Sequence, residues 1–397
     1  MLWYAIDSRE INVARIELIA TATFGLEAVV KREIENLGYK ILKSENAKIT
    51  YLTDERGIVR SNLMLRCADR VLLKMGEFKA ETSEELFQQT KAIAWEEWIP
   101  EDGKFTVNCT TVKSKLRSEP ACQKTVKKAI VDRLAAIYMK DTFSETGSPY
   151  TVKVTILKDI VTLTIDTSGQ GLHKRAYRVK NVAAPIKETL AAAMVQLSFW
   201  KSGRLLIDPF CGSGTIAIEG AMYMRNIAPG LYRRFASEEW SNIIAPEIWK
   251  EERKLAYERI DYDADVKIIA SDRDAKAVEA ARANAEEAGV DDCIEFGVSD
   301  MKTLKIPEDY AIIICNPPYG ERINEKKELY SVYRHMKQLL EENETLSLYM
   351  ITADNDAPKA LLPREADRRR KLYNGRIETC YYQYYGKKPD EKGKFDK

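Results

Sequence analysis

The stretch RLLIDPFCGSGTIAIEGAMYM, residues 204–224, decides the fold of the C-terminal half of this chain. It begins with an apolar run that predicts a short buried strand and ends in a segment of helical composition. Between the two, Gly212 and Gly214 permit a sharp backbone turn and a close approach to a ligand. The helix that follows directs its free N–H groups at that ligand. The stretch therefore predicts a strand, a ligand-binding loop and a helix.

The same alternation of strand and helix continues downstream. Apolar runs that predict further strands cover residues 266–272, 293–300, 310–315 and 346–352, and amphipathic segments lie between them. Strands that alternate with helices indicate a parallel, doubly wound sheet of the α/β class. Ligands bind such sheets at the carboxyl ends of the strands, where every unusual motif of this half falls.

Bulk properties narrow the class of protein. A chain of 397 residues predicts two or three domains. It has no apolar stretch long enough to span a bilayer and no secretory start, which favours a cytoplasmic protein without a membrane partner. Its two histidines and its seven scattered cysteines, none in a C-x-x-C pair, predict neither a metal site nor a disulfide framework.

Acidic residues at the strand ends favour a nucleoside ligand that carries a cationic amine over NAD. The loop also fits the weak dinucleotide pattern G-x-G-x-x-[GA], which alone would suggest NAD. Asp208, however, precedes the glycines, where it can meet a cationic amine, and the ribose-binding acid that NAD requires about 20 residues on would have no strand to carry it. Asp272 ends the next strand and can accept hydrogen bonds from two ribose hydroxyls, since Asp274 is the better helix cap. Asp300 follows the third strand as an adenine contact or, equally, as a cap.

The motif Asn316-Pro317-Pro318-Tyr319 predicts the chemistry. The Asn316 side-chain carbonyl and the Pro317 backbone carbonyl are two acceptors that the proline rings hold at a fixed separation. Two such acceptors suit the hydrogens of a planar aromatic amine and aim its nitrogen lone pair at an electrophile. Tyr319 offers a ring on which a base can stack. Catalysis would then consist mainly of positioning against an activated methyl donor.

Three local clusters of basic residues indicate a phosphate-bearing partner, although the net charge is only +1. They lie in residues 111–133, 172–180 and 363–376, and solvated helix faces are an equal alternative for each. The candidate RNA contacts are Lys113, Lys115, Arg117, Lys124, Lys127, Lys128, Lys174, Arg175, Arg178 and Arg322. For Arg322, directly after the catalytic motif, an internal ion pair is the alternative.

These motifs resemble the class I S-adenosylmethionine-dependent methyltransferases that modify exocyclic amines. The segments GLHKRAYR, APIKETLAAA, DPFCGSGTIAIEGA and NPPYGER are similar to the THUMP-domain guanine methyltransferases of RNA, the RlmL-like family. The resemblance implies a Rossmann-like methyltransferase domain preceded by an α+β ferredoxin-like and THUMP region that binds RNA. It further implies formation of N2-methylguanosine in ribosomal or transfer RNA.

The resemblance also implies boundaries and site residues. The expected parts are an extension (1–15), a ferredoxin-like subdomain (16–65), a THUMP domain (56–168, overlapping the former), the methyltransferase domain (169–385) and a charged tail (386–397). The expected catalytic residues are Asn316, Pro317, Pro318 and Tyr319. The expected contacts to S-adenosylmethionine are Asp208, Pro209, Phe210, Cys211, Gly212, Ser213, Gly214, Thr215, Asp272, Arg273, Asp300, Lys187 and Glu188.

Other functions compete with this one. A DNA adenine or cytosine methyltransferase and a protein glutamine methyltransferase also use Asn-Pro-Pro-Tyr, and the basic α+β region favours structured RNA over both. A third alternative is a non-catalytic RNA-binding assembly factor. The intact glycine loop and the intact Asn-Pro-Pro-Tyr motif argue against it. A carbon-5 pyrimidine methyltransferase needs a nucleophilic cysteine, whereas Cys211 and Cys315 are expected to serve as small apolar packing groups.

Overall fold

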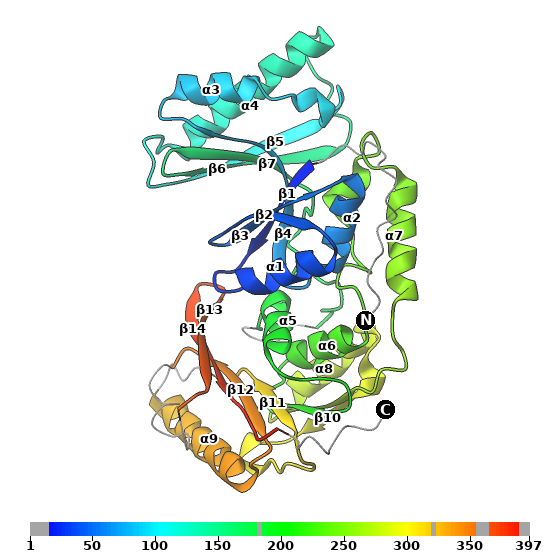
Figure 1. The fold of residues 1–397 in the computed structure, drawn as a ribbon, viewed down its shortest axis with the longest axis vertical. Coiled ribbons are helices and arrows are strands. Elements are labelled where there is room, and N and C mark those ends of the chain that lie inside the picture. The colour runs from blue at the N-terminus through cyan, green and yellow to red at the C-terminus, as the bar shows by residue number, and fades with distance from the viewer. Residues whose placement is uncertain (1–15, 181–184, 319–322, 355–364, 389–397) are drawn as a thin grey trace. The chain divides into compact units, whose positions relative to one another are not determined.

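The computed structural model describes residues 16–180, 185–318, 323–354 and 365–388. The expected extension, residues 1–15, and most of the expected tail lie outside these ranges. Contacts divide the chain into two compact units, and Figure 1 labels the helices and strands of both. The first comprises the described parts of Met1–Ala22, Val30–Leu172 and Arg233–Leu255, and the second those of Thr23–Val29, His173–Tyr232 and Ala256–Lys397.

The first unit is built on one seven-stranded sheet of order β2-β3-β1-β4-β7-β6-β5. Its strands are β1 (Ile16–Ala22), β2 (Lys40–Glu45), β3 (Lys48–Thr53), β4 (Ala68–Lys79), β5 (Lys104–Val112), β6 (Pro149–Leu157) and β7 (Ile160–Asp166). Its helices are α1 (Glu27–Asn36), α2 (Glu55–Met64), α3 (Ser83–Lys91), α4 (Glu119–Tyr138) and α7 (Pro246–Glu258), the first and last of which run across a boundary between the units. Short 3-10 turns cover Trp95–Glu97 and Ala236–Glu239.

Strand β4 joins the strands of the two regions expected before the methyltransferase domain. Strand β4 pairs antiparallel with β1 on one side and with β7 on the other, from Leu72↔Asp166 to Lys79↔Ile160. The buried segment Thr167–Ser168 extends this junction, because the Asn62 amide and the Val71 backbone both bind it. The ferredoxin-like and THUMP regions thus share one continuous hydrogen-bonded sheet.

The second unit is the doubly wound sheet, with strand order β10-β9-β8-β11-β12-β14-β13. Its strands are β8 (Leu205–Asp208), β9 (Lys267–Asp272), β10 (Ile294–Val298), β11 (Ile312–Cys315), β12 (Ser347–Thr352), β13 (Arg368–Asn374) and β14 (Ile377–Tyr384). Its helices are α5 (Glu188–Leu197), α6 (Thr215–Met224), α8 (Ala275–Ala288) and α9 (Ile323–Glu342), with 3-10 turns at Asp291–Cys293 and Met301–Thr303. Strands β8 to β12 are parallel, and β14 is antiparallel to both of its neighbours.

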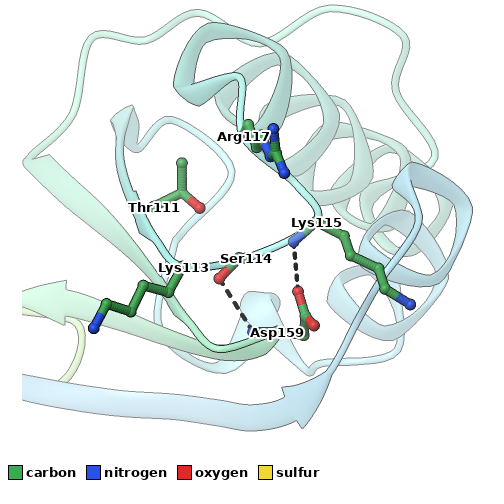
Figure 2. Close-up of a pocket in the computed structure, with 6 residues that line it drawn as sticks. All are labelled: Thr111, Lys113, Ser114, Lys115, Arg117 and Asp159. Atoms are coloured by element: carbon green, nitrogen blue, oxygen red, sulfur yellow. Dashed lines mark hydrogen bonds between the residues drawn. The ribbon is translucent and has the colours of Figure 1, made fainter.

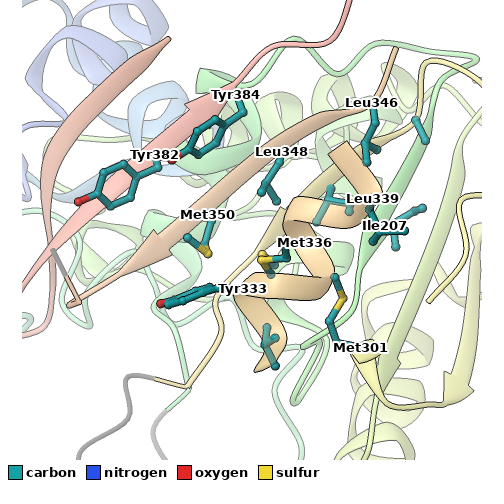
Figure 3. Packing of buried hydrophobic residues seen from close by; sticks show 14 of the residues in the cluster. Ile207, Met301, Tyr333, Met336, Leu339, Leu346, Leu348, Met350, Tyr382 and Tyr384 are labelled. Atoms are coloured by element: carbon teal, nitrogen blue, oxygen red, sulfur yellow. The ribbon is translucent and has the colours of Figure 1, made fainter. Parts of the chain in front are cut away.

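Alternation along the strands distributes the core over both faces of this sheet. On one face, Tyr333, Met336 and Leu339 of α9 pack against Leu348 and Met350 of β12 and against Tyr382 and Tyr384 of β14 (Figure 3). On the other face the Tyr381 hydroxyl donates to the Met194 carbonyl of α5 at 2.8 Å. Since both faces are covered, the strands are apolar on both sides and only their ends can carry polar groups.

None of the helices within the described residues is both long and apolar enough to cross a membrane.

Candidate active site

The glycine loop adopts the conformation that only glycines take without strain. Gly214 has φ +84° and precedes α6, and Gly212 has φ +50°. A Cβ atom added at Gly214 would lie 3.0 Å from Ala281 Cβ of α8, so the loop also depends on a close helix approach. The Gly212 N–H donates to Asp272 Oδ2 at 3.1 Å, and the Cys211 N–H to the Ser271 carbonyl at 2.9 Å. The loop is therefore fixed to the end of the neighbouring strand.

Asp208 ends β8 as a fully buried carboxyl group. Its Oδ1 accepts the Phe210 N–H at 3.2 Å, whereas its Oδ2 has no hydrogen-bond partner in the described structure. Burial raises the pKa of Asp208 from 3.8 to about 8, and the nearby Asp272 carboxylate adds to the rise. An unpartnered buried acceptor is costly by itself and favours a ligand that donates to it or carries positive charge.

The other two acids occupy the expected strand ends but differ in their partners. Asp272 is half-buried, and its Oδ1 accepts the Asp274 N–H at 3.0 Å. Asp274 caps α8, as expected, by accepting the Lys276 N–H at 2.9 Å. Asp300 caps the short turn Met301–Thr303 and lies 3.5 Å from the Lys302 ammonium. Capping therefore accounts for Asp300 at least in part, and its contact with adenine stays a prediction.

Arg178 is placed differently from the sequence-based expectation. Its guanidinium donates to Glu188 Oε1 and Ser213 Oγ, both at 2.7 Å, and to Thr215 Oγ1 at 2.8 Å. A fourth bond reaches the Ile186 carbonyl at 3.3 Å. With its side chain only 13 % exposed, Arg178 is not available as the RNA contact that its basic neighbourhood predicted. It joins the start of α5 to both sides of Gly214.

The surroundings of Arg175 likewise differ from those of the RNA contact that the sequence predicted. Its side chain is 2 % exposed and lies 3.3 Å from Glu219 Oε1 of α6, which also accepts the Tyr177 hydroxyl at 3.0 Å. Removing one partner of such a buried pair is strongly destabilising, because it leaves an uncompensated charge in the interior. Arg175 therefore belongs to the support of the glycine loop rather than to an RNA surface.

Asn284 of α8 is a positioning residue that the sequence did not reveal. It is fully buried, and its amide donates to the carbonyls of Ser213 and Lys180 at 3.1 and 3.0 Å. Its Oδ1 accepts the N–H groups of Val179 and Lys180 at 3.0 Å. A single asparagine inside an alanine-rich helix carries no local sign of this role, because its partners lie about 70 and 100 residues away.

Asn316 lies beside Asp208 at the carboxyl edge of the sheet. Strands β8 and β11 pair in parallel with Ile207 opposite Ile313, so Asn316 lies two residues beyond the level of Asp208. Its Oδ1 is buried and has no hydrogen-bond partner in the described structure. Pro317 is buried and Pro318 is exposed. The remaining motif residues, Tyr319 and the expected contact Arg322, lie outside the described residues.

The two cysteines next to the motifs are poor nucleophiles. Burial raises the pKa values of the Cys211 and Cys315 thiols, and the negative charge of Asp208 adds to both shifts. A nucleophilic cysteine needs a lowered pKa. Their environments agree with the expected apolar packing role.

The remaining expected cofactor contacts surround the same loop. Glu188 is buried in its ion pair with Arg178, Lys187 is half-buried, and Arg273 is exposed and pairs with Glu328. Among the described residues, no group of His, Cys, Asp or Glu side chains is arranged to hold a metal ion.

A basic pocket lies at the turn between β5 and α4 in the first unit (Figure 2). Its cavity volume is about 530 Å³, and its lining residues are Thr111, Lys113, Ser114, Lys115, Arg117 and Asp159. The only carboxylate of this lining accepts the Lys115 N–H at 2.6 Å, while the Asp159 N–H donates to Ser114 Oγ at 3.1 Å. The Lys115 ammonium pairs with Glu81. Lys113 and Arg117 are exposed.

The helix beside this pocket carries three more expected contacts. Lys124, Lys127 and Lys128 are exposed on α4, with the Lys127 ammonium over the Phe105 ring and the Lys128 ammonium over the Phe87 ring. Lys174 is also exposed, in the second unit. The structure thus brings six of the expected basic contacts together on one element and its adjoining turn.

Comparisons with known proteins agree with this arrangement. Three family models match the chain: the RlmL ferredoxin-like domain at residues 17–72, the THUMP domain at 80–166 and the RMKL-like methyltransferase domain at 175–383. The Bacillus subtilis protein YpsC, which carries the name of an RNA methyltransferase, is 48 % identical over 372 residues, covering 93 % of this chain and 96 % of its own.

Solved structures share the whole fold. A Listeria monocytogenes protein described as an N6-adenine-specific DNA methylase is 44 % identical with a TM-score of 0.89, covering 94 % of this chain and 97 % of its own. The methyltransferase SMU.472, solved with SAH, is 39 % identical with a TM-score of 0.90, covering 95 % and 99 %. Identity at this level over nearly the full length shows the family. This chain therefore belongs to the RMKL-like methyltransferases, with a ferredoxin-like and a THUMP domain before the catalytic domain.

Proposed function

We propose that this protein transfers a methyl group from S-adenosylmethionine to the exocyclic 2-amino group of a guanosine in RNA. Ribosomal 23S RNA is the first candidate substrate, and transfer RNA is the second. The observation that carries the proposal is the buried, unpartnered Oδ1 of Asn316 at the carboxyl end of β11. An acceptor in this state favours a bound donor, and an aromatic amine supplies one.

The residues present fit the cofactor. The buried Asp208 Oδ2 lacks a partner, Asp272 ends the adjacent strand, and Gly214 permits the close approach of α8 that shapes the loop. S-adenosylmethionine, when bound, supplies a methyl group on a positively charged sulfur. In this proposal Asp208 offsets positive charge, Asp272 accepts from the ribose hydroxyls, and Arg178 holds the loop between them in shape.

Asn316 positions the amine rather than removing its proton. Its Oδ1 and the Pro317 carbonyl would accept the two amine hydrogens, which leaves the nitrogen lone pair free to form the new N–C bond while the methyl–sulfur bond breaks and its electron pair neutralises the sulfur. The amine becomes acidic after it gains the methyl group and loses a proton to water. No strong base is needed, so positioning provides most of the rate enhancement.

RNA as the substrate is supported by the first unit and by the YpsC relative. The THUMP match covers α4 and the basic pocket of Figure 2, whose exposed Lys113 and Arg117 can pair with phosphates. The name of the Listeria relative favours a second candidate, methylation of adenine in DNA, because the amine of adenine would fit the same pair of acceptors.

The experiment is transfer of labelled methyl groups to nucleic acid from a strain that lacks this gene. Ribosomal RNA, transfer RNA and DNA are assayed as separate pools, and labelled nucleosides are identified by mass spectrometry. We expect N2-methylguanosine from one RNA pool and none from the Asn316→Ala variant, which should still bind S-adenosylmethionine. Label in N6-methyladenine from DNA, or in neither RNA pool, would refute the proposal.

A further inference from the structure

The hairpin formed by β13 and β14 projects beyond the catalytic edge of the sheet. Strand β14 is antiparallel to β12, and β13 is antiparallel to β14, so β13 ends at the same edge as the catalytic strand β11. Cys380 pairs with Thr352, the last residue of β12. The hairpin therefore continues three residues beyond its neighbour, to Ile377, or about 10 Å.

A tight turn closes the projecting end. Asn374 pairs with Ile377, and Gly375 and Arg376 connect them. Gly375 has φ +64°, the conformation required at the first central position of such a turn. Arg376 is exposed, and no ion-pair partner for it exists among the described residues. The turn thus presents a cation at the point of the hairpin that lies farthest along the catalytic edge.

Aromatic rings and a second cation lie directly below the turn. The Tyr373 ring meets the Phe24 ring edge to face, with centroids 6.0 Å apart at 78°. Phe24 is 46 % exposed, and the Lys371 ammonium lies 5.6 Å from the centre of the Tyr373 ring. Glu378 engages this lysine at 2.6 Å and accepts from the Tyr373 hydroxyl at 3.3 Å. The ring of Tyr373 is therefore held in a defined orientation.

The segment that carries Phe24 is fixed to the hairpin by a close backbone contact. It belongs to Thr23–Val29, which groups with the second unit. A Cβ atom added at Gly25 would lie 2.6 Å from the Lys371 carbonyl oxygen, so only glycine permits this approach. Phe24, Lys371, Tyr373 and Arg376 together form a preorganised group, called here the hairpin tip.

We propose that the hairpin tip binds the RNA nucleotides that flank the methylated guanosine. This inference rests on the proposed function, because it takes RNA as the substrate. A guanidinium pairs with phosphate oxygens in two parallel hydrogen bonds, and an exposed aromatic ring stacks on a base. Strand spacing and register place Arg376 about 20 Å from Asn316, a distance that an RNA strand spans within a few nucleotides.

Protection of the sheet edge explains only part of these features. Strand β13 is the edge strand, and charged side chains on an edge hinder pairing with other chains. That role accounts for Arg368 and Arg369, which lie toward the opposite end of β13. It does not account for an exposed arginine in the turn or for an exposed ring beside Tyr373. Charge complementarity therefore favours a phosphate-bearing occupant at the tip.

The test compares two charge reversals at opposite ends of one strand. Arg376→Glu changes the tip, and Arg368→Glu makes the same change about 20 Å from it on an equally exposed residue. With the RNA pool that the wild-type protein methylates, we expect Arg376→Glu to raise the KM for RNA about tenfold or more. Its kcat at saturating RNA and its Kd for S-adenosylmethionine should stay close to wild type, and Arg368→Glu should behave as wild type throughout.

A second pair of variants tests the ring. Phe24→Leu removes the exposed ring, and we expect it to weaken RNA binding about fivefold or more, whereas Phe24→Tyr, which keeps a ring, should bind RNA like the wild type. Equal KM values for Arg376→Glu and Arg368→Glu would overturn the hairpin proposal while leaving the proposed function intact. A wild-type protein that methylates no RNA would instead overturn the proposed function and the RNA assignment of the tip with it.

Discussion

The buried carboxyl group of Asp208 should make cofactor binding depend on pH. Its pKa is raised to about 8, so in the free protein about 1 % of molecules carry the charged form at pH 6 and about half carry it at pH 8. S-adenosylmethionine is positively charged and should bind the charged form preferentially. Its affinity should therefore increase by up to about 50-fold between pH 6 and pH 8.

The matched variant is Asp208→Asn, which keeps the shape of the side chain and its bond to the Phe210 N–H but cannot ionise. At pH 6 the wild type is almost fully protonated, so its affinity for the cofactor should exceed that of the variant least. The ratio of the wild-type affinity to the variant affinity should then increase by up to about 50-fold between pH 6 and pH 8. Titration of the cofactor's own amine affects both proteins alike and cancels in this ratio.

Isothermal titration calorimetry without RNA measures both expected effects. In buffers of different ionisation enthalpy at pH 7, the wild type should release about 0.9 more protons per cofactor bound than the variant releases. A wild type and a variant with the same pH dependence of Kd would refute the assignment of Asp208 as the group that meets the positive charge.

Stability provides an independent check on the same carboxyl group. The pKa of Asp208 is higher in the folded than in the unfolded state, so folding becomes less favourable as pH rises from about 4 to about 8. In that window the unfolded chain has lost the proton while the folded protein retains it. Asp208→Asn should therefore raise the free energy of unfolding at pH 8, by at most about 5 kcal/mol, and leave it nearly unchanged at pH 4. Denaturant unfolding at the two pH values measures the difference.

Three further changes address the loop, the thiol and the basic pocket. Arg178→Gln removes the hydrogen bonds from Arg178 to the side chains of Glu188, Ser213 and Thr215, so it should raise the Kd for S-adenosylmethionine about tenfold or more and lower the melting temperature. An unchanged Kd would contradict the role of Arg178 in shaping the glycine loop. Cys315→Ala should keep the rate of methyl transfer within a few-fold of the wild-type rate, because burial raises the pKa of this thiol. If the variant folds but transfers no methyl group, Cys315 acts as a nucleophile. The double change Lys113→Glu and Arg117→Glu should weaken RNA binding and reduce the magnitude of the slope of log K, the association constant for RNA, against log salt concentration by about 1 to 2. Filter binding measures this slope, and an unaltered slope would exclude the pocket as a phosphate site.

Much of the catalytic edge could be predicted from the sequence because its determinants are local. The apolar run, the glycines and the helix of residues 204–224 lie within 21 positions, and each favours the observed conformation through its own backbone preference. The same holds for Asp274 as a helix cap and for the strand that ends in Cys315. Parallel strand order then brings the separate strand ends to one edge.

The roles of several polar residues depended on distant partners instead. Arg175 and Arg178 lie in a run of basic residues that indicates a solvated surface. In the structure both side chains are largely buried, and they pair with Glu219 and Glu188, respectively. Asn284 has four bonds to segments about 70 and 100 residues away. No local preference distinguishes such residues from exposed ones, because their burial depends on which elements pack against them.

The sequence by itself determined strands β8 to β12, the doubly wound class and the polar residues at the ends of these strands, since periodicity and turn chemistry act over a few residues. Only the tertiary structure decided that β4 and β7 join the two N-terminal regions into one sheet and that the β13–β14 hairpin extends beyond the catalytic edge. Pairing between strands depends on register and on side chains from distant segments. These contacts form only when the whole chain has folded, so no short stretch of sequence specifies them.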